Sequence, residues 1–103
     1  MRKLVRDLIP GLIQAENPDV KTGVYGKKGY RKALLEKLVE EATEARDTGG
    51  AEFLLAEELG DLLDVLDAVV QEFGIPQWAI DQEREKKRAA KGGFAGRKWV
   101  DFE

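Results

Sequence analysis

With 103 residues, the chain is long enough for one small domain with a modest core. It contains no cysteine and no histidine, which excludes disulfides, zinc–thiolate sites, imidazole metal ligands and Cys- or His-dependent nucleophilic catalysis. The net charge of −3 conceals a segregation, since residues 31–72 hold twelve acidic against four basic side chains and residues 84–98 hold seven basic against one acidic. An acidic centre flanked by basic ends is poorly suited to bind a nucleic-acid polymer, which needs one continuous basic surface, so no such partner is expected.

The N-terminal part predicts one short helix. In Asp7-Leu8-Ile9-Pro10, Asp7 is the expected N-cap, and Pro10 falls in the first turn, where its missing N–H costs no intrahelical bond. Asn17-Pro18-Asp19 should end this helix near Glu16, and residues 20–29, with three glycines, favour an extended or loop-like segment.

Two long helices should follow. From Tyr30 to about Asp47, apolar residues recur at spacings of three and four until Thr48-Gly49-Gly50 ends the pattern. From Ala51 to Phe73 a second apolar stripe runs until Gly74, with Pro76 just beyond it. The tight glycine connection predicts that these two helices pack antiparallel.

A last helix is expected from Pro76 to about Ala90, followed by a loop and a short extended tail that is a candidate to pair with residues 20–25. The predicted fold is all-α, an antiparallel bundle of about four helices in a single domain over residues 1–103. No apolar run approaches the roughly 20 residues of a membrane span, and the N-terminus is too polar for a signal peptide, so we expect a cytoplasmic protein without membrane association.

Glu58 is the most informative acidic residue. On a helical wheel it falls inside the apolar arc of the 51–73 helix, with Leu54, Leu62 and Val65 as neighbours, while Asp61 lies one turn away at the edge. An ionised carboxylate there costs several kcal/mol unless it is paired or bound to a metal. Glu58 therefore needs a cation.

The preceding helix carries a related pair, Glu41 and Glu44, at the edge of its apolar face. If the two helices pack antiparallel, both pairs face each other, and four carboxylates a few ångströms apart require counter-charge. Because the chain offers only oxygen ligands to a metal at these carboxylates, the metal would be a hard cation such as Mg²⁺. Two alternatives stay open: Lys37 and Arg46 neutralise the carboxylates in a structural ion-pair network, or all four face water.

The two acidic segments also resemble a known family. Lys37-Leu38-Val39-Glu40-Glu41-Ala42-Thr43-Glu44 and Glu57-Glu58-Leu59-Gly60-Asp61-Leu62-Leu63-Asp64 resemble the ExxE and ExxD signature of the all-α nucleoside triphosphate pyrophosphatases, the MazG-like superfamily. Residues 3–10 and 91–94 resemble its small single-domain branch related to phosphoribosyl-ATP pyrophosphohydrolase.

The resemblance implies Mg²⁺-dependent hydrolysis, with Mn²⁺ as a substitute, of nucleoside triphosphates to monophosphate and pyrophosphate, in the house-cleaning of modified nucleotides. By motif position, Glu41 and Glu44 match the first metal-binding pair, and Glu58 and Asp61 match the second. Beside its role as a ligand, Glu41 is a candidate catalytic residue. Glu40 and Asp64, next to the motif residues, are candidates to orient or deprotonate water.

Phosphates beyond the metal need Lys or Arg. Lys37, one turn before Glu41, is the first candidate for substrate binding. A purely structural role, an i,i+4 salt bridge to Glu41, explains this lysine equally well. The remaining candidates lie in the N-terminal motif and beside the glycine-rich tail: Arg6, Lys3, Lys91, Arg97 and Lys98.

Other functions remain open. A catalytically silent helical module with an acidic docking face is the alternative to an enzyme, whereas a calcium-binding protein is disfavoured because the chain has no Asp-x-Asp-x-Asp-Gly loop. The long helices should leave apolar surface uncovered, and members of the superfamily typically form dimers or tetramers. We therefore expect a homodimer or homotetramer. No motif identifies the base or the sugar of the substrate.

Overall fold

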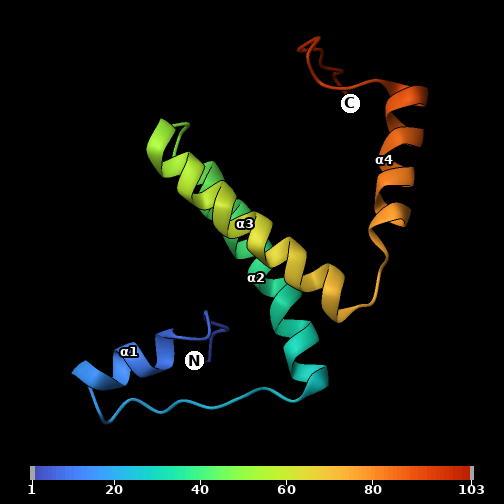
Figure 1. Ribbon diagram of the computed structural model, residues 1–103. Helices are drawn as coiled ribbons and strands as arrows, with labels where there is room; N and C mark the ends of the chain where they lie inside the picture. Colours follow the sequence, from blue (N-terminus) through green and yellow to red (C-terminus); the bar gives the residue numbers. More distant parts are fainter. Residues whose placement is uncertain (1, 103) are drawn as a thin grey trace. The chain divides into compact units, whose positions relative to one another are not determined.

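The computed structural model describes residues 2–102, and within that range it holds four α-helices and no β-strand (Figure 1). They are α1 (Ile9–Glu16), α2 (Lys27–Asp47), α3 (Glu52–Glu72) and α4 (Gln77–Lys91). The prediction of an all-α fold with four helices is confirmed. The predicted pairing of the tail with residues 20–25 does not form a strand, and residues 92–102 follow α4 without regular secondary structure.

The chain divides into two compact units, Met1–Phe73 and Gly74–Glu103. The first contains α1, α2 and α3, and the second contains α4 and the tail. None of the helices within residues 2–102 has the length and apolar character needed to cross a lipid bilayer.

In the first unit, α2 and α3 lie side by side and antiparallel, as predicted (Figure 1). Their connection is tight because Gly49 and Gly50 both adopt positive φ, at 65° and 85°, which side chains disfavour. The Thr48 hydroxyl donates to the Ala45 carbonyl oxygen (2.7 Å) and accepts from the Gly50 N–H (3.2 Å), which satisfies backbone groups at the end of α2.

The first two helices begin elsewhere than predicted. The expected N-cap at Asp7 is wrong: α1 begins at Ile9, no side chain caps it, and the Ile9 N–H instead donates to the Arg6 carbonyl oxygen (3.0 Å). Helix α2 begins at Lys27, three residues earlier than the glycine-rich sequence suggested. Its first turn includes Gly29, where an added Cβ would lie 3.2 Å from the Tyr25 ring, so this glycine permits the close approach of Tyr25.

Burial between α2 and α3 is limited. Among the described residues only Ala33, Leu34 and Glu41 are buried, and all three belong to α2. On α3 the predicted apolar arc is half-buried at Leu55, Leu62, Val65 and Val69 but exposed at Leu54. One of the three buried side chains is therefore a carboxylate.

Candidate metal centre

Helix packing brings three of the four predicted metal ligands together. One carboxylate oxygen from each of Glu41, Glu44 and Glu58 lies within 4.8 Å of the others, and we call these residues the inner cluster. Glu41 and Glu44 are one turn apart on α2, and Glu58 faces them from α3. Glu41 is buried, Glu58 is half-buried and Glu44 is exposed, so the cluster extends from the interhelical contact to solvent.

Two oxygens of the inner cluster lack a partner. The buried Oε2 atoms of Glu41 and Glu58 form no hydrogen bond, although a buried polar atom without one is costly. The Glu41 side chain is only 7% exposed, and its other oxygen, Oε1, lies 3.3 Å from the Lys37 ammonium nitrogen. Among residues 2–102, Lys37 is the one basic side chain paired with the cluster within 4 Å, while the charges of Glu44 and Glu41 contribute at longer range to the raised pKa of Lys3.

The environment of Glu58 opposes its negative charge. Burial, followed by the neighbouring carboxylates of Glu44 and Glu41, raises the pKa of Glu58 from 4.5 to about 7. In the absence of a cation, a proton is therefore the simplest partner for this carboxylate near neutral pH. That a cation takes this place at Glu58 stays a prediction.

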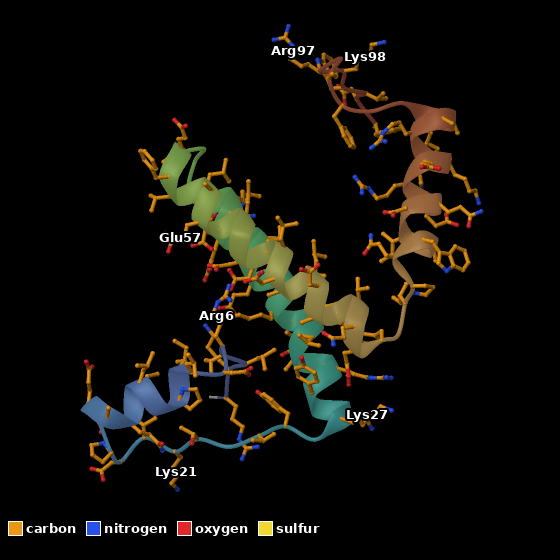
Figure 2. All side chains as sticks on the ribbon, viewed as in Figure 1. Arg6, Lys21, Lys27, Glu57, Arg97 and Lys98 are labelled. Carbon is orange, nitrogen blue, oxygen red and sulfur yellow. The ribbon has the colours of Figure 1, made fainter. Side chains whose placement is uncertain are left out.

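Asp61, the fourth predicted ligand, is not part of the inner cluster. Its Oδ1 accepts a 2.8 Å hydrogen bond from Arg6 Nη2, while Arg6 Nη1 donates to Asp64 Oδ2, also at 2.8 Å. Figure 2 shows Arg6 reaching from the N-terminal segment towards the α2–α3 pair. This double pairing raises the pKa of Arg6, through Asp64 first and Asp61 second. The arginine keeps its charge under all ordinary conditions.

Glu40, the remaining acidic candidate, is held by two lysines. Lys3 Nζ donates to Glu40 Oε1 at 2.8 Å, and Lys37 Nζ lies 3.6 Å from the same oxygen. The hydrogen bond from Lys3 is the main cause that lowers the pKa of Glu40, which makes this carboxylate a weaker base in this state. We call Glu40, Asp61 and Asp64 the outer set, because each carries a lysine or arginine partner from the N-terminal segment.

The structure agrees only in part with each of the two alternatives to a metal site. Lys37 contacts Glu41, as the ion-pair alternative supposed, but Arg46 pairs with its neighbour Asp47 instead (3.0 Å). Glu41 does not face water, and Glu58 is only half-exposed, so the predicted helix phase is correct for these two residues.

A groove beside the carboxylates could accept a ligand. It has a volume of about 560 Å³. Six of its lining residues are aliphatic, and the others are four acidic side chains, two basic ones and one aromatic ring: Asp7, Glu41, Asp61, Asp64, Arg6, Lys37 and Tyr30. A smaller groove of about 270 Å³ shares Leu4 and Lys37 with the first, and its other lining residues are Arg2, Lys3, Tyr25, Ala33, Glu36 and Glu40. Lys3, Arg6 and Lys37, all predicted to bind substrate, are therefore gathered next to the carboxylates.

The other predicted basic residues lie in the second unit. Lys91 ends α4, and Arg97 and Lys98 follow in the tail, where Arg97 adopts a positive φ of 54°. All three side chains are exposed within their own unit.

Sequence reasoning did not anticipate the pairing of Arg6 with Asp61 and Asp64 or that of Lys3 with Glu40. These partners are 55, 58 and 37 residues apart, so no local spacing connects them. The basic residues of the N-terminal motif are the sole signal in the sequence, and that signal favours phosphate as well as a carboxylate.

The donor set fits a hard divalent cation. Glu41, Glu44 and Glu58 offer only oxygen, the ligand preferred by Mg²⁺ and Mn²⁺, and the two unpartnered oxygens would gain the counter-charge that they lack. Comparisons with protein-family models, with characterised proteins and with solved structures give no match for this chain. The candidate function therefore depends on the chemistry of the site.

Proposed function

We propose that this protein is a Mg²⁺-dependent nucleoside triphosphate pyrophosphohydrolase. It would cleave between the α and β phosphates to release a nucleoside monophosphate and pyrophosphate, with modified nucleotides as its substrates. The observation that carries the proposal is the inner cluster, in which three carboxylates converge and two buried oxygens have no partner. The resemblance of residues 37–44 and 57–64 to a pyrophosphatase signature supports the same reaction.

In this function the inner cluster holds the cation. A divalent cation bound by Glu41, Glu44 and Glu58 would supply Lewis-acid stabilisation of the negative charge that develops on the phosphate oxygens. Lys37 and Arg6 line the adjacent groove, where an ammonium and a guanidinium group can bind further phosphate oxygens. The reaction needs no covalent nucleophile, in keeping with a chain that has no cysteine or histidine.

Glu40 and Asp64 are the candidates to orient water or accept its proton. In this structure Lys3 holds Glu40 and Arg6 holds Asp64, so each carboxylate must exchange a basic partner before it can act on water. These ion pairs are exposed, and exposed pairs contribute little to stability. Such an exchange on substrate binding is therefore energetically accessible.

The direct test is a pyrophosphate-release screen with Mg²⁺ across ordinary and modified nucleotides, including phosphoribosyl-ATP. We expect pyrophosphate from at least one nucleotide, and we expect Glu58→Gln and Glu41→Gln to abolish its release with an unchanged helical circular dichroism spectrum. Asp67→Asn is the matched control, because Asp67 is an exposed acidic residue of the same α3 helix.

Release of orthophosphate alone would contradict the proposal. So would the absence of Mg²⁺ and Mn²⁺ binding in calorimetry, together with stabilisation by Glu58→Leu. That second result would favour a catalytically silent helical module whose acidic face docks a basic partner.

The proposal includes self-association into a dimer or tetramer. Helix α2 leaves Leu35 and Val39 exposed one turn apart, and α3 leaves Leu59 and Leu63 exposed at the same spacing. Apolar stripes of this kind are typical of helices that pack against another helix. Light scattering at micromolar concentration should give at least twice the monomer mass, and a monomer would contradict this part of the proposal.

A further inference from the structure

The smaller groove, of about 270 Å³, offers three side-chain groups that the candidate metal centre does not use. The Tyr25 ring, the Arg2 guanidinium group and the Glu36 carboxylate all line it. Every ion pair between described residues that line this groove ends on Glu40, which is held by two lysines. Arg2 and Glu36 are exposed and form no ion pair or side-chain hydrogen bond within residues 2–102, so both can pair with a ligand.

Arg2 and Glu36 thus carry opposite charges in one groove without an ion pair between them. A ligand that pairs with both must present hydrogen-bond acceptors to one and donors to the other, because a guanidinium group only donates and a carboxylate only accepts. The tyrosine ring adds a surface on which a flat ring can stack. The groove therefore suits a flat heterocycle that has both kinds of polar edge.

The size of the groove and the placement of its aromatic ring also favour such a ligand. Its volume lies just below the roughly 300 to 1,000 Å³ of pockets that hold drug-sized ligands, so it suits one base better than a complete nucleotide. The Tyr25 side chain is half-buried and packs against Gly29, where an added Cβ would lie 3.2 Å from the ring. The ring is held in place before a ligand binds, which lowers the entropic cost of stacking.

Lys37 joins this groove to the candidate metal centre. It lines both grooves, and its ammonium nitrogen lies 3.6 Å from Glu40 Oε1 and 3.3 Å from Oε1 of Glu41, a member of the inner cluster. An ammonium group at this position can bind a phosphate oxygen. A nucleotide with its phosphates at the inner cluster can therefore extend past Lys37 and place its base in the smaller groove.

We infer that the smaller groove binds the base of the substrate and that this base is guanine. Guanine O6 and N7 accept two hydrogen bonds from one arginine, here Arg2, and the neighbouring N1–H and 2-amino group donate to one carboxylate, here Glu36. Adenine presents an amino group where guanine has O6, and cytosine offers the carboxylate only a single amino group. A guanine modified away from these edges keeps the same contacts. The inference rests on the proposed function and adds the base, which that function leaves open.

The first experiment compares GTP with inosine triphosphate, which differs from GTP only in lacking the 2-amino group. In the Mg²⁺-dependent pyrophosphate-release assay, we expect kcat/KM to be about tenfold higher for GTP than for inosine triphosphate, ATP or CTP. Glu36→Gln should bring the ratio of GTP to inosine triphosphate to within about twofold, because an amide cannot accept both N–H bonds. Glu16→Gln is the matched control, since Glu16 is exposed and lines neither groove.

Tyr25 should affect every base alike, because stacking does not depend on the polar edges. Tyr25→Leu should lower kcat/KM about tenfold for all four nucleotides and leave the ratio of GTP to inosine triphosphate unchanged. Tyr25→Phe, which keeps the ring, should lose much less. Equal losses in the two variants would contradict stacking on this ring.

The second experiment measures binding without hydrolysis, by NMR titration of GMP and of inosine monophosphate into the metal-free protein. We expect GMP to bind about tenfold more tightly, and Glu36→Gln to remove most of this difference. Equal affinity for the two monophosphates, or a preference for GTP that survives Glu36→Gln, would overturn the guanine site and leave the proposed function intact. If no nucleotide releases pyrophosphate but GMP still binds more tightly, the proposed function fails and the guanine site stands without it.

Discussion

The inner cluster and the outer set are built from the same chemical group and the same two helices, yet they differ in what surrounds them. Glu40, Asp61 and Asp64 each have a lysine or arginine partner at 2.8 Å from the N-terminal segment. Glu41 and Glu58 each keep a buried oxygen without a partner. The difference shows that an acidic motif does not tell by itself which carboxylates stay unpaired, because basic residues far away in the sequence pair with some of them and not with others.

The comparison also separates two kinds of electrostatic effect. The lysine beside Glu40 lowers the pKa of that carboxyl group, whereas burial and like charges raise the pKa of Glu58 to about 7. Glu40 on α2 and Glu58 on α3 therefore differ in their preference for a proton, although they belong to the same helix pair. A divalent cation would therefore be most stabilising beside Glu58, the carboxylate that favours a proton in the metal-free protein.

The largest expected effect is on cation affinity. Glu41→Gln should weaken Mn²⁺ binding by about 100-fold, because it removes a buried ligand. Asp64→Asn should change the binding of the first ion by less than about threefold, because Asp64 belongs to the outer set. Calorimetry on both variants measures the contrast, and equal losses would remove the distinction between the two sets.

The next effect is the pH dependence of cation binding. Below about pH 7 the cation must displace a proton from Glu58, so its apparent affinity should fall about tenfold per pH unit. Titrations in buffers of different ionisation enthalpy would count the released protons. An affinity that stays constant between pH 5 and 7 would show that Glu58 is not protonated in the free protein.

A smaller effect concerns the stability of the metal-free protein. The folded pKa of Glu58, about 7, lies above its ordinary value of 4.5, so the native state binds the extra proton between these values. Its contribution to stability is therefore lost as pH rises from about 4.5 to about 7. Thermal unfolding in a chelator should show this decline, and Glu58→Gln should reduce it.

The smallest effect lies away from both sets. Arg31 stacks over the Phe73 ring, with 4.9 Å to its centroid, and donates to the Glu72 carbonyl oxygen, which joins α2 to the end of α3. Arg31→Ala should lower the free energy of unfolding by about 1 kcal/mol. Denaturant titration measures this loss, and cation affinity should stay unchanged. A parallel loss of cation binding would mean that the inner cluster depends on the stability of the whole helix pair.

Much of the fold could be predicted from the sequence because its signals are local. The spacing of apolar residues located α2 and α3, and Gly49, Gly50 and Gly74 marked where they end. The starts of α1 and α2 were less predictable. A backbone carbonyl took the place of the expected Asp7 cap, and the packing of Tyr25 on Gly29 accompanies an earlier start to α2.

For the site, the sequence by itself determined that Glu58 lies on an apolar helix face and that Glu41 and Glu44 share one side of the preceding helix, since helical periodicity places residues three apart together. Only the tertiary structure decided that Asp61 pairs with Arg6 and that Glu40 pairs with Lys3. Ion pairs between residues so far apart in the chain depend on how the N-terminal segment lies against the helices. The helical spacing of residues in the sequence carries no information about that placement.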